Sequence, residues 1–499
     1  MFSNIQFDRI PELLVYTPDD PLIFSTSLFL FLFFFFLIIY NVFGKYKNFR
    51  LGLVIVFSLY FYYKSAGLYF LILIVSAFAN FYFGKWIAAT ENFNYKRLFL
   101  VLALILNLGL LGYFKYTNFI IEIINDVSQG EIEPLAIFLP IGISFYTFKA
   151  LTYVFDIYFD TLKPTGSLRD FSLYVFFFPN ILAGPIDRAS AFLPQINQEP
   201  VLSKEDIGKA VLLISVGLIK KVVIADYISI NFVDRIFDYP LRFTGVENLL
   251  ALYGYTLQIY CDFSGYSDMA IGTALFLGFR LMDNFNSPFK ATSIADFWRR
   301  WHISLSKWLL DYLFKPLQFS MHSIKIWANV IALFLTFLVC GIWHGAGWNF
   351  IMWGVIHGFY MSIGLLLQKP KAYIYNKLKI NNTPFLKFFQ VLVTFHLVAF
   401  SFLVFRAYDL QGVKDILEQI FTFFHGEVFT QFIEKMPIIF ALMLIGYSFH
   451  FMPVKFENKV LKIVSGMPMI GKAILLAVVI WIAAQFKSAD IQPFIYFQF

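Results

Sequence analysis

Charged residues are scarce in this sequence. Asp, Glu, Lys and Arg make up 14% of its 499 residues, whereas hydrophobic residues make up 59%. A soluble chain needs a much larger share of polar residues to cover its surface. Several apolar runs approach the ~20 residues that cross a bilayer as a helix. The composition therefore excludes a soluble enzyme and predicts an all-α polytopic membrane protein, built as a single integral membrane domain over residues 1–499.

Cysteine is almost absent, because the chain has only Cys261 and Cys340, each inside an apolar segment. Neither has metal-ligand spacing, and no Cys-His cluster or His-Glu-x-x-His pair occurs, so we expect no metal and no bound cofactor. A phosphate-binding loop and a dinucleotide fingerprint are also missing, which argues against an ATP-driven pump. No internal repeat occurs, which weakens the case for a transporter built from two matching halves.

Acidic residues are fewer than basic ones, and the formal net charge is +7. In a polytopic protein an excess of Lys and Arg retains loops on the cytoplasmic side, so nucleic acid is not the expected partner. The loops expected in the cytoplasm are 44–50, 84–97, 369–387 and 453–472, and those expected outside are 121–133 and 406–435.

Hydropathy predicts membrane segments along most of the chain. The clearest are 22–43, 98–120, 326–342, 350–367, 388–405, 437–452 and 473–486. Two shorter pieces, 51–63 and 68–83, are expected to form a hairpin. Between 134 and 272 the spans are harder to phase, because Pro and Gly interrupt apolar runs at 140–144 and 178–185. Such breaks at membrane depth require cover by protein or a water-filled cavity, so we expect re-entrant or non-helical segments there.

Polar residues within these apolar regions are candidates for function. Residues 207–232 form a helix candidate with Lys220 and Lys221 in its middle, where they line a cavity or mark a membrane edge. Asp262 and Asp268 fall inside the apolar run 249–277. A carboxylate at the bilayer centre costs ~2.5–3.5 kcal/mol on insertion scales, so both are expected to face the interior. They are possible cavity-lining residues, although a structural hydrogen bond or ion pair is the more common role.

Residues 283–323 are the least membrane-like stretch. Ser293 and Asp296 resemble a helix cap, and apolar residues then recur at three- and four-residue spacing as far as Leu313. The spacing predicts one amphipathic helix, suited to the membrane interface or to the cytoplasmic rim of a cavity. His302 lies on the border of its apolar face, where a solvated or hydrogen-bonded histidine is common.

A histidine turn interrupts the apolar runs near residue 344. Residues 339–348 read V-C-G-I-W-H-G-A-G-W, with His344 among glycines and tryptophans. An ionisable group at membrane depth is a functional-site candidate, and a hydrogen bond to a neighbouring helix is the alternative. The last nine residues read I-Q-P-F-I-Y-F-Q-F and contain one hydroxyl, that of Tyr496. This tail is an interfacial aromatic anchor or a segment that docks into a cavity or a partner.

Five ordered blocks resemble one family, the membrane-bound O-acyltransferases (MBOAT), in its bacterial branch that is similar to alginate O-acetyltransferase. More distantly, they resemble the D-alanyl transfer protein of teichoic acid modification. The blocks are P-I-G-I-S-F-Y-T-F from Pro140, F-F-P-N-I-L-A-G-P-I from Phe177, D-F-S-G-Y-S-D-M-A-I-G from Asp262, D-F-W-R-R-W-H-I-S-L-S-K-W-L-L-D-Y-L from Asp296 and G-I-W-H-G-A-G-W-N-F from Gly341.

The resemblance implies a helical funnel of about 11 transmembrane helices plus re-entrant and amphipathic segments, with a thinned centre where two cavities approach each other. It implies His344 as the catalytic histidine, His302 as a second one, and Tyr496 as a possible acyl relay. We divide the chain into N-terminal helices (22–133), a catalytic core (134–368), C-terminal helices (369–486) and an external aromatic tail (487–499).

The function that the resemblance implies is O-acyl transfer in the cytoplasmic (inner) membrane of a bacterium. An acetyl group would pass from a cytoplasmic thioester, acetyl-CoA or an acyl carrier, to a hydroxyl of an extracytoplasmic polysaccharide or peptidoglycan. An extracytoplasmic acyltransferase or esterase-like protein is the expected partner, with membrane lipids around the helices. Two alternatives stay open, a lipid O-acyltransferase of the same family and a polytopic transporter or flippase.

Overall fold

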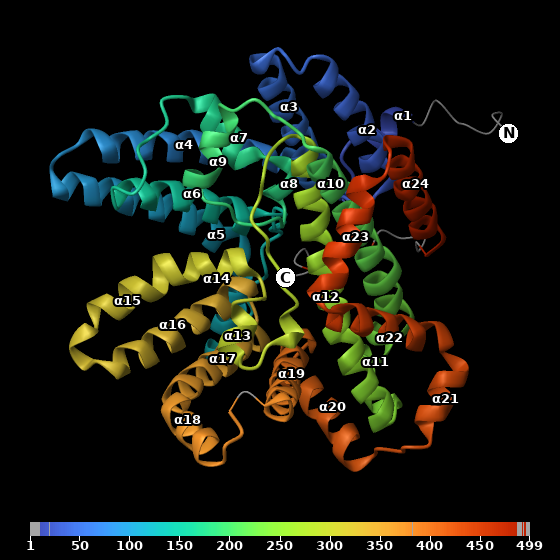
Figure 1. The fold of residues 1–499 in the computed structure, drawn as a ribbon. Coiled ribbons are helices and arrows are strands. Elements are labelled where there is room, and N and C mark those ends of the chain that lie inside the picture. Colours follow the sequence, from blue (N-terminus) through green and yellow to red (C-terminus); the bar gives the residue numbers. More distant parts are fainter. Residues whose placement is uncertain (1–9, 19, 382, 487–491, 493, 496–499) are drawn as a thin grey trace.

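The computed structural model describes residues 10–18, 20–381, 383–486, 492, 494 and 495, and Figure 1 shows their arrangement. All regular structure among them is helical, which confirms the all-α prediction. The first helices are α1 (Ile10–Leu14), α2 (Ser27–Val42), α3 (Lys47–Ala66), α4 (Phe70–Ala89) and α5 (Phe93–Ser128). The C-terminal helices are α18 (Gln368–Lys377), α19 (Pro384–Arg406), α20 (Leu410–Thr422), α21 (Val428–Lys435), α22 (Pro437–Phe451), α23 (Val454–Gly466) and α24 (Met469–Phe486).

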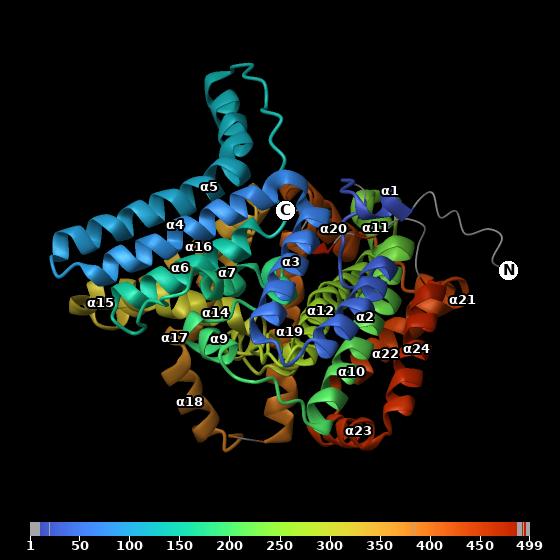
Figure 2. The same cartoon turned by 90° about the horizontal axis from the view of Figure 1, so that it is seen from above.

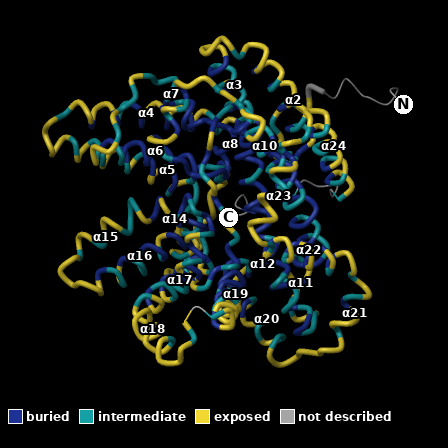
Figure 3. Tube along the Cα trace, viewed as in Figure 1, coloured by how far each residue is buried: buried dark blue, intermediate teal, exposed yellow. Residues whose placement is uncertain are grey.

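The central helices enclose the most buried part of the molecule, drawn dark blue in Figure 3. They are α6 (Ile143–Tyr158), α7 (Leu168–Phe176), α8 (Phe178–Ile181), α9 (Ala189–Ile196), α10 (Lys204–Leu218), α11 (Asp234–Asp238), α12 (Gly245–Phe276), α13 (Ile294–Trp298), α14 (Ile303–Leu309), α15 (Lys315–Ser320), α16 (Ile326–His344) and α17 (Trp348–Leu366). Short 3₁₀ turns are η2 (Gly67–Tyr69), η5 (Pro240–Arg242), η6 (Pro288–Lys290) and η8 (His322–Ile324).

Within the described residues, six helical stretches are long and apolar enough to cross a membrane. A seventh results if α21 and α22, bent by 96° at their junction, form one span. The multi-pass prediction is thus confirmed, whereas the count of about 11 spans is not. Two predicted spans are helices of 16 and 15 residues, α2 and α22. Helices of this size are ~22–24 Å long and fall short of the ~30 Å hydrocarbon core.

Helices α3 and α4 meet at a sharp turn, as the sequence predicts, but they diverge from it instead of packing side by side (Figure 1). Gly67 allows the turn, because its φ of 60° is costly for other residues. A Cβ there would also lie 2.8 Å from the ring of Tyr16. The predicted hairpin is therefore a splayed pair.

Helix α5 continues beyond the other helices and stands out from one face of the molecule, opposite the face that carries α18 and α23 (Figure 2). Two asparagines hold the returning chain against it. Asn118 pairs with both backbone polar groups of Leu135, at 3.0 and 2.9 Å, and Asn125 does the same with Ile132, at 2.9 Å each. The backbone groups of Ile132 and Leu135 are thus satisfied without a second helix.

The two predicted breaks lie against each other in the core. Gly142, with a φ of 79°, ends the return from α5, and a Cβ on it would lie 2.7 Å from the carbonyl oxygen of Ile181. The second break follows α8 and is fixed by a buried amide, since Asn180 accepts a hydrogen bond from Lys149 at 2.6 Å. Its own Nδ2 donates to Asp187 at 3.3 Å. These breaks are covered by protein, as membrane-depth breaks require.

The predicted helix over 207–232 is divided. After α10 the chain forms π-helices η3 (Ile219–Asp226) and η4 (Ser229–Val233). The lysine pair lies in the first of these, and both side chains form ion pairs with α12 rather than marking a membrane edge. Lys220 is 2.7 Å from Asp268 and Lys221 is 2.8 Å from Asp262. Local π-helix is rare and often occurs at functional positions.

The prediction of one amphipathic helix after Ser293 is wrong. Ser293 does cap a helix, by accepting a 3.1 Å hydrogen bond from the Asp296 N–H, but α13 has only five residues. The chain breaks at His302, whose φ is 43°, and then forms α14, the π-helix η7 (Leu310–Phe314) and α15. Trp298, Trp301 and Trp308 are buried in the protein instead of lying at an interface. Tertiary contacts override the local helical pattern here.

Candidate functional site

His344 is the last residue of α16, in a pair of helices that pack unusually closely. A Cβ on Gly341 would lie 2.4 Å from the carbonyl oxygen of Phe350 and 2.8 Å from Gly354 Cα. The absence of side chains at these glycines lets the backbones of α16 and α17 touch. The imidazole of His344 is buried between the rings of Trp353, at 4.9 Å, and Phe405, at 5.4 Å between centres.

Lys115 of α5 supports the end of α16. Its ammonium donates to the carbonyl oxygens of Trp343 and His344, at 2.7 Å each. The last carbonyls of a helix have no partner within it and carry partial negative charge, so a cation is well placed there. Lys115 lies within the predicted span 98–120 and was not among the predicted site residues. Its position within an apolar run was the signal that could have identified it.

Replacing Lys115 by methionine is expected to lower the thermal stability of the purified protein. The substitution keeps most of the side-chain volume and removes the charge-assisted hydrogen bonds, which are worth roughly 1.5–3 kcal/mol each. Thermal unfolding in detergent measures the change. Lys414→Met, at an exposed position of α20, is the matched control and should leave the unfolding midpoint in place. Equal midpoints for the two variants would contradict the supporting role.

A small cavity opens beside the histidine. It has a volume of about 30 Å³ and is lined by Lys115, Trp343, His344, Leu182 and the segment Leu139–Phe145. Both predicted Pro/Gly breaks contribute to its wall, since Leu182 belongs to the second break. One water needs about 10–15 Å³ on this measure, so the cavity accepts small polar groups next to the imidazole.

His302 is held in place by Asn284. The Asn284 Oδ1 accepts hydrogen bonds from the Ser304 N–H at 3.2 Å and from the Ser304 hydroxyl at 2.9 Å. The same oxygen lies 3.1 Å from His302 Nδ1. A backbone N–H can only donate, which fixes this atom as the amide oxygen, so His302 Nδ1 must carry hydrogen. In the neutral ring Nε2 is then the basic nitrogen.

The two predicted histidines lie in one aromatic enclosure. Trp343 neighbours both, with ring centres 5.0 Å from His344 and 6.4 Å from His302. Phe145 stacks on His302 at 6.3 Å, and Phe263 of α12 meets its ring edge-on at 4.7 Å. His302 is fully buried and keeps a left-handed backbone, a strained conformation that is common at functional positions.

A groove lies on the other side of this enclosure. It has a volume of about 740 Å³ and is lined by Asp156, Phe159, Thr161, Arg188, Ser190, Asp311, Tyr312, Lys315, Pro316 and Phe319. Its rim includes residues next to Asp160, which pairs at 2.9 Å with Lys96 of the loop expected in the cytoplasm. The groove therefore belongs to the predicted cytoplasmic side.

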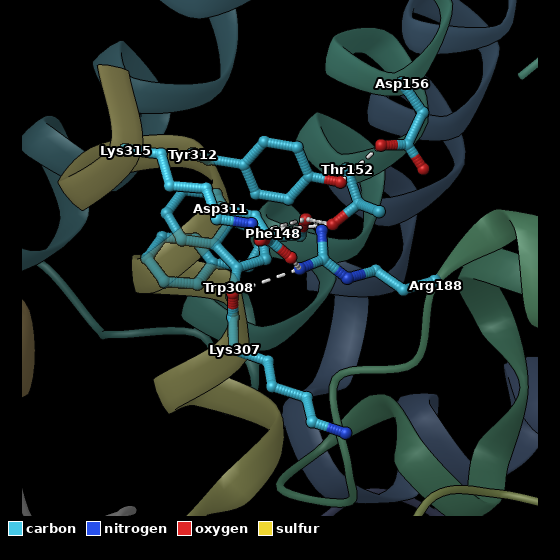
Figure 4. A network of polar contacts seen from close by, with 9 residues as sticks. All are labelled: Phe148, Thr152, Asp156, Arg188, Lys307, Trp308, Asp311, Tyr312 and Lys315. Atoms are coloured by element: carbon cyan, nitrogen blue, oxygen red, sulfur yellow. Dashed lines mark hydrogen bonds and ion pairs between the residues drawn. The ribbon is translucent and has the colours of Figure 1, made fainter. Parts of the chain in front are cut away.

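Figure 4 shows the polar network that shapes this groove. The Arg188 guanidinium donates to Asp311 at 2.7 Å and lies 4.4 Å from the ring centre of Tyr312. Lys315 donates to the other oxygen of Asp311, also at 2.7 Å, and the Tyr312 hydroxyl donates to Asp156. The acidic and basic side chains thus fix one another and hold the groove in shape.

A stack of three aromatic rings leads from the groove towards the histidine cavity. Trp308 stacks on Phe148 with 3.9 Å between ring centres, and Phe148 stacks on Trp343 at 5.2 Å. The Trp308 indole N–H is fixed by Thr152 Oγ1 at 3.0 Å (Figure 4). Phe148 and Trp308 therefore form a partition beside the groove residue Tyr312. Trp343 connects this partition to His344, with 5.0 Å between the ring centres of Trp343 and His344.

The two predicted acidic residues form separate ion pairs on α12, Asp268 with Lys220 and Asp262 with Lys221. Asp268 and its partner Lys220 line a separate cavity of about 440 Å³ that also includes Cys261 and His450. Asp262 is buried, and its Oδ2 accepts a 2.8 Å hydrogen bond from the Ile495 N–H. Tyr496 lies outside the described residues, but its neighbour Ile495 and Phe494 are buried in the core.

Comparison with known proteins adds an independent line of evidence. The model of the membrane-bound O-acyltransferase family matches residues 160–369. A protein named peptidoglycan O-acetyltransferase from Helicobacter pylori is 36% identical over 428 residues, 80% of this chain and 79% of the relative. The chain belongs to the membrane-bound O-acyltransferase family. This MBOAT protein is therefore a multi-pass membrane acyltransferase.

Two further proteins with different names are similar to this MBOAT chain. One, named "Probable alginate O-acetylase AlgI" from Pseudomonas aeruginosa, is 38% identical over 413 residues, 81% of this chain and 75% of the relative. Another, a teichoic acid D-alanyltransferase from Bacillus subtilis, is 31% identical over 277 residues, 53% of this chain and 68% of the relative. The matched family region includes both His302 and His344.

Proposed function

We propose that the protein transfers an acetyl group from a cytoplasmic thioester to the outer face of a bacterial cytoplasmic membrane, for O-acetylation of peptidoglycan or an extracytoplasmic polysaccharide. The observation that carries this proposal is the position of His344. A stack of Trp308, Phe148 and Trp343 links a groove on the predicted cytoplasmic side to its imidazole. The acetyl group and the class of acceptor are inferred from the names of two relatives, peptidoglycan O-acetyltransferase and alginate O-acetylase.

The groove beside Arg188 is the proposed entry for the donor, acetyl-CoA or an acyl-carrier thioester. Its volume of about 740 Å³ suits a pantetheine-like arm, because small-molecule sites commonly measure about 300–1,000 Å³. Displacing the rings of Trp308 and Phe148 would open the partition and let the thioester carbonyl approach Trp343 and the imidazole beside it. No lipid-sized acyl group is needed for this route, which favours the acetyl reading over a lipid acyltransferase.

His344 acts as general base in the proposed reaction. The imidazole takes the proton of the accepting hydroxyl, the oxygen bonds to the thioester carbonyl carbon, and the C–S bond breaks. The imidazolium then returns the proton to the thiolate, so the histidine ends neutral. Backbone N–H groups of the glycine turn 345–347 stabilise the oxyanion, and His302 offers Nε2 as a second basic nitrogen in the same enclosure.

Tyr496 is the proposed first acceptor, which would carry the acetyl group to an extracytoplasmic acyltransferase or esterase-like partner. The support is the burial of Phe494 and Ile495, the residues just before it, one aromatic ring away from His302. Tyr496→Phe is expected to abolish the acetyl-tyrosine ester and to lower glycan acetylation at least tenfold, because only the hydroxyl is lost. Mass spectrometry of trapped protein measures the ester. Tyr408→Phe, at an exposed tyrosine, is the control.

The test of the proposed function compares envelope fractions from cells with and without this gene. Loss of O-acetyl groups from peptidoglycan or exopolysaccharide, restored by complementation, is the expected result. Unchanged glycans together with loss of an acylated lipid would instead establish a lipid O-acyltransferase. Unchanged glycans and lipids with altered uptake of a solute would establish a transporter.

A further inference from the structure

Asp262 belongs to a buried charge cluster that the reaction at His344 does not use. Lys221 lies between two carboxylates, at 2.8 Å from Asp262 and 2.8 Å from Asp226. Lys221 and Asp262 are only 2% and 4% exposed. One ammonium faces two carboxylates in the core, where the remaining carboxylate oxygens need further hydrogen-bond donors.

The tail supplies such a donor. The Ile495 N–H points to Asp262 Oδ2 at 2.8 Å, while Oδ1 faces Lys221. Phe494 is fully buried, and its ring lies 4.8 Å from Tyr266 and 5.4 Å from Phe263, on the turn of α12 that follows Asp262. A carboxylate that accepts a backbone N–H is a charge-assisted pair, stronger than a bond between neutral groups.

The site is close to the catalytic enclosure. Phe263 contacts Phe494 on one side and meets the ring of His302 at 4.7 Å on the other. A single aromatic ring therefore lies between the docked tail and the second histidine. The ion pair between Asp262 and Lys221 joins α12 to η3 and does not involve the tail.

We propose that Asp262, oriented by Lys221, together with Phe263 and Tyr266, forms a receptor for an aromatic peptide, and that its ligand is the Phe494–Ile495 segment of this chain. Asp262 is a positioning residue that binds the peptide backbone through the Ile495 N–H. The rings of Phe263 and Tyr266 contact the ring of Phe494. The proposed docking is supported by the contacts of Phe494 and Ile495 with α12 and does not depend on acetyl transfer. Its consequence, presentation of the residue after Ile495 to the histidines, rests on the proposed acetyl transfer.

Hydrogen–deuterium exchange on the full-length protein in detergent tests the docking without any activity measurement. The Ile495 amide should be protected in the unmodified protein and should exchange at least tenfold faster in Asp262→Ala. Asp268→Ala is the matched control, because it removes a similar carboxylate–lysine pair from the same helix, one in which neither Phe494 nor Ile495 takes part. Exchange of the Ile495 amide at the rate of an unstructured peptide, or equal protection in Asp262→Ala, would overturn the receptor.

A second pair of variants leaves the core intact, in case Asp262→Ala does not fold. Ile495→Pro removes the donating N–H, whereas Ile495→Val keeps it and most of the side chain. Acetylation of the glycan should fall at least tenfold in the first and less than twofold in the second. Equal acetylation would overturn the presentation role. If the Ile495 amide is protected but the protein acetylates nothing, the receptor is supported and the proposed function is refuted.

Discussion

His344→Ala is expected to lower the rate of acetyl transfer by ~10²–10⁴-fold, the usual contribution of a general base. The imidazole is the proposed general base, and alanine offers no replacement for its basic nitrogen. The fold should persist, since the close contact of α16 and α17 depends on Gly341 and Gly354 rather than on the histidine. Glycan-bound acetate, measured by mass spectrometry in cells with matched protein levels, gives the result.

The control for this prediction is His322→Ala, at an exposed histidine in the turn before α16. Its acetylation should equal that of the unmodified protein. Full acetylation in His344→Ala would remove the histidine from the mechanism and with it the main argument for the site. A loss as large in His322→Ala would indicate a general effect of substitution near α16.

Gly341→Ala should reduce activity by about two orders of magnitude, although the glycine touches no substrate. Its new Cβ would lie 2.4 Å from the Phe350 carbonyl oxygen, so α16 and α17 must move apart. Overpacking typically costs ~1–3 kcal/mol. The end of α16 carries His344, and a displacement of about 1 Å at a reacting group can cost ~10²-fold in rate.

Gly364→Ala tests whether the effect arises from close packing. This glycine lies in α17 as well, but a Cβ on it would meet no atom within 4 Å. Its variant should match the unmodified protein in folded yield, thermal stability and acetylation. Comparable loss in both variants would refute the packing argument, and so would unchanged activity in Gly341→Ala.

The histidine turn and the central breaks could be predicted because their signals are local. Long apolar runs on both sides of residues 345–347 predict two helices joined by a short turn. Pro and Gly end helices because of their backbone conformations. The interior position of Asp262 and Asp268 follows in the same way, from the cost of exposing a carboxylate to lipid. These features needed no knowledge of distant contacts.

Other features depend on contacts between segments far apart in the sequence. The break at His302 could not be predicted, since its neighbours favour a helix and the left-handed conformation depends on Asn284. The support from Lys115 reaches a carbonyl more than two hundred residues away. The number of spans is not confirmed, because apolar windows do not reveal where a helix ends. The partition of Phe148 and Trp308 also emerges only from packing.

The attachment of the tail has a kinetic consequence. Helix α24 ends at Phe486, eight residues before Phe494, so the docked segment belongs to the same molecule as its receptor. A short tether gives an effective concentration of ~1 mM or more, and a contact too weak to capture a free peptide then stays largely occupied. Weak contacts also dissociate quickly. A receptor of modest intrinsic affinity can therefore remain occupied and still release its ligand many times within a catalytic cycle.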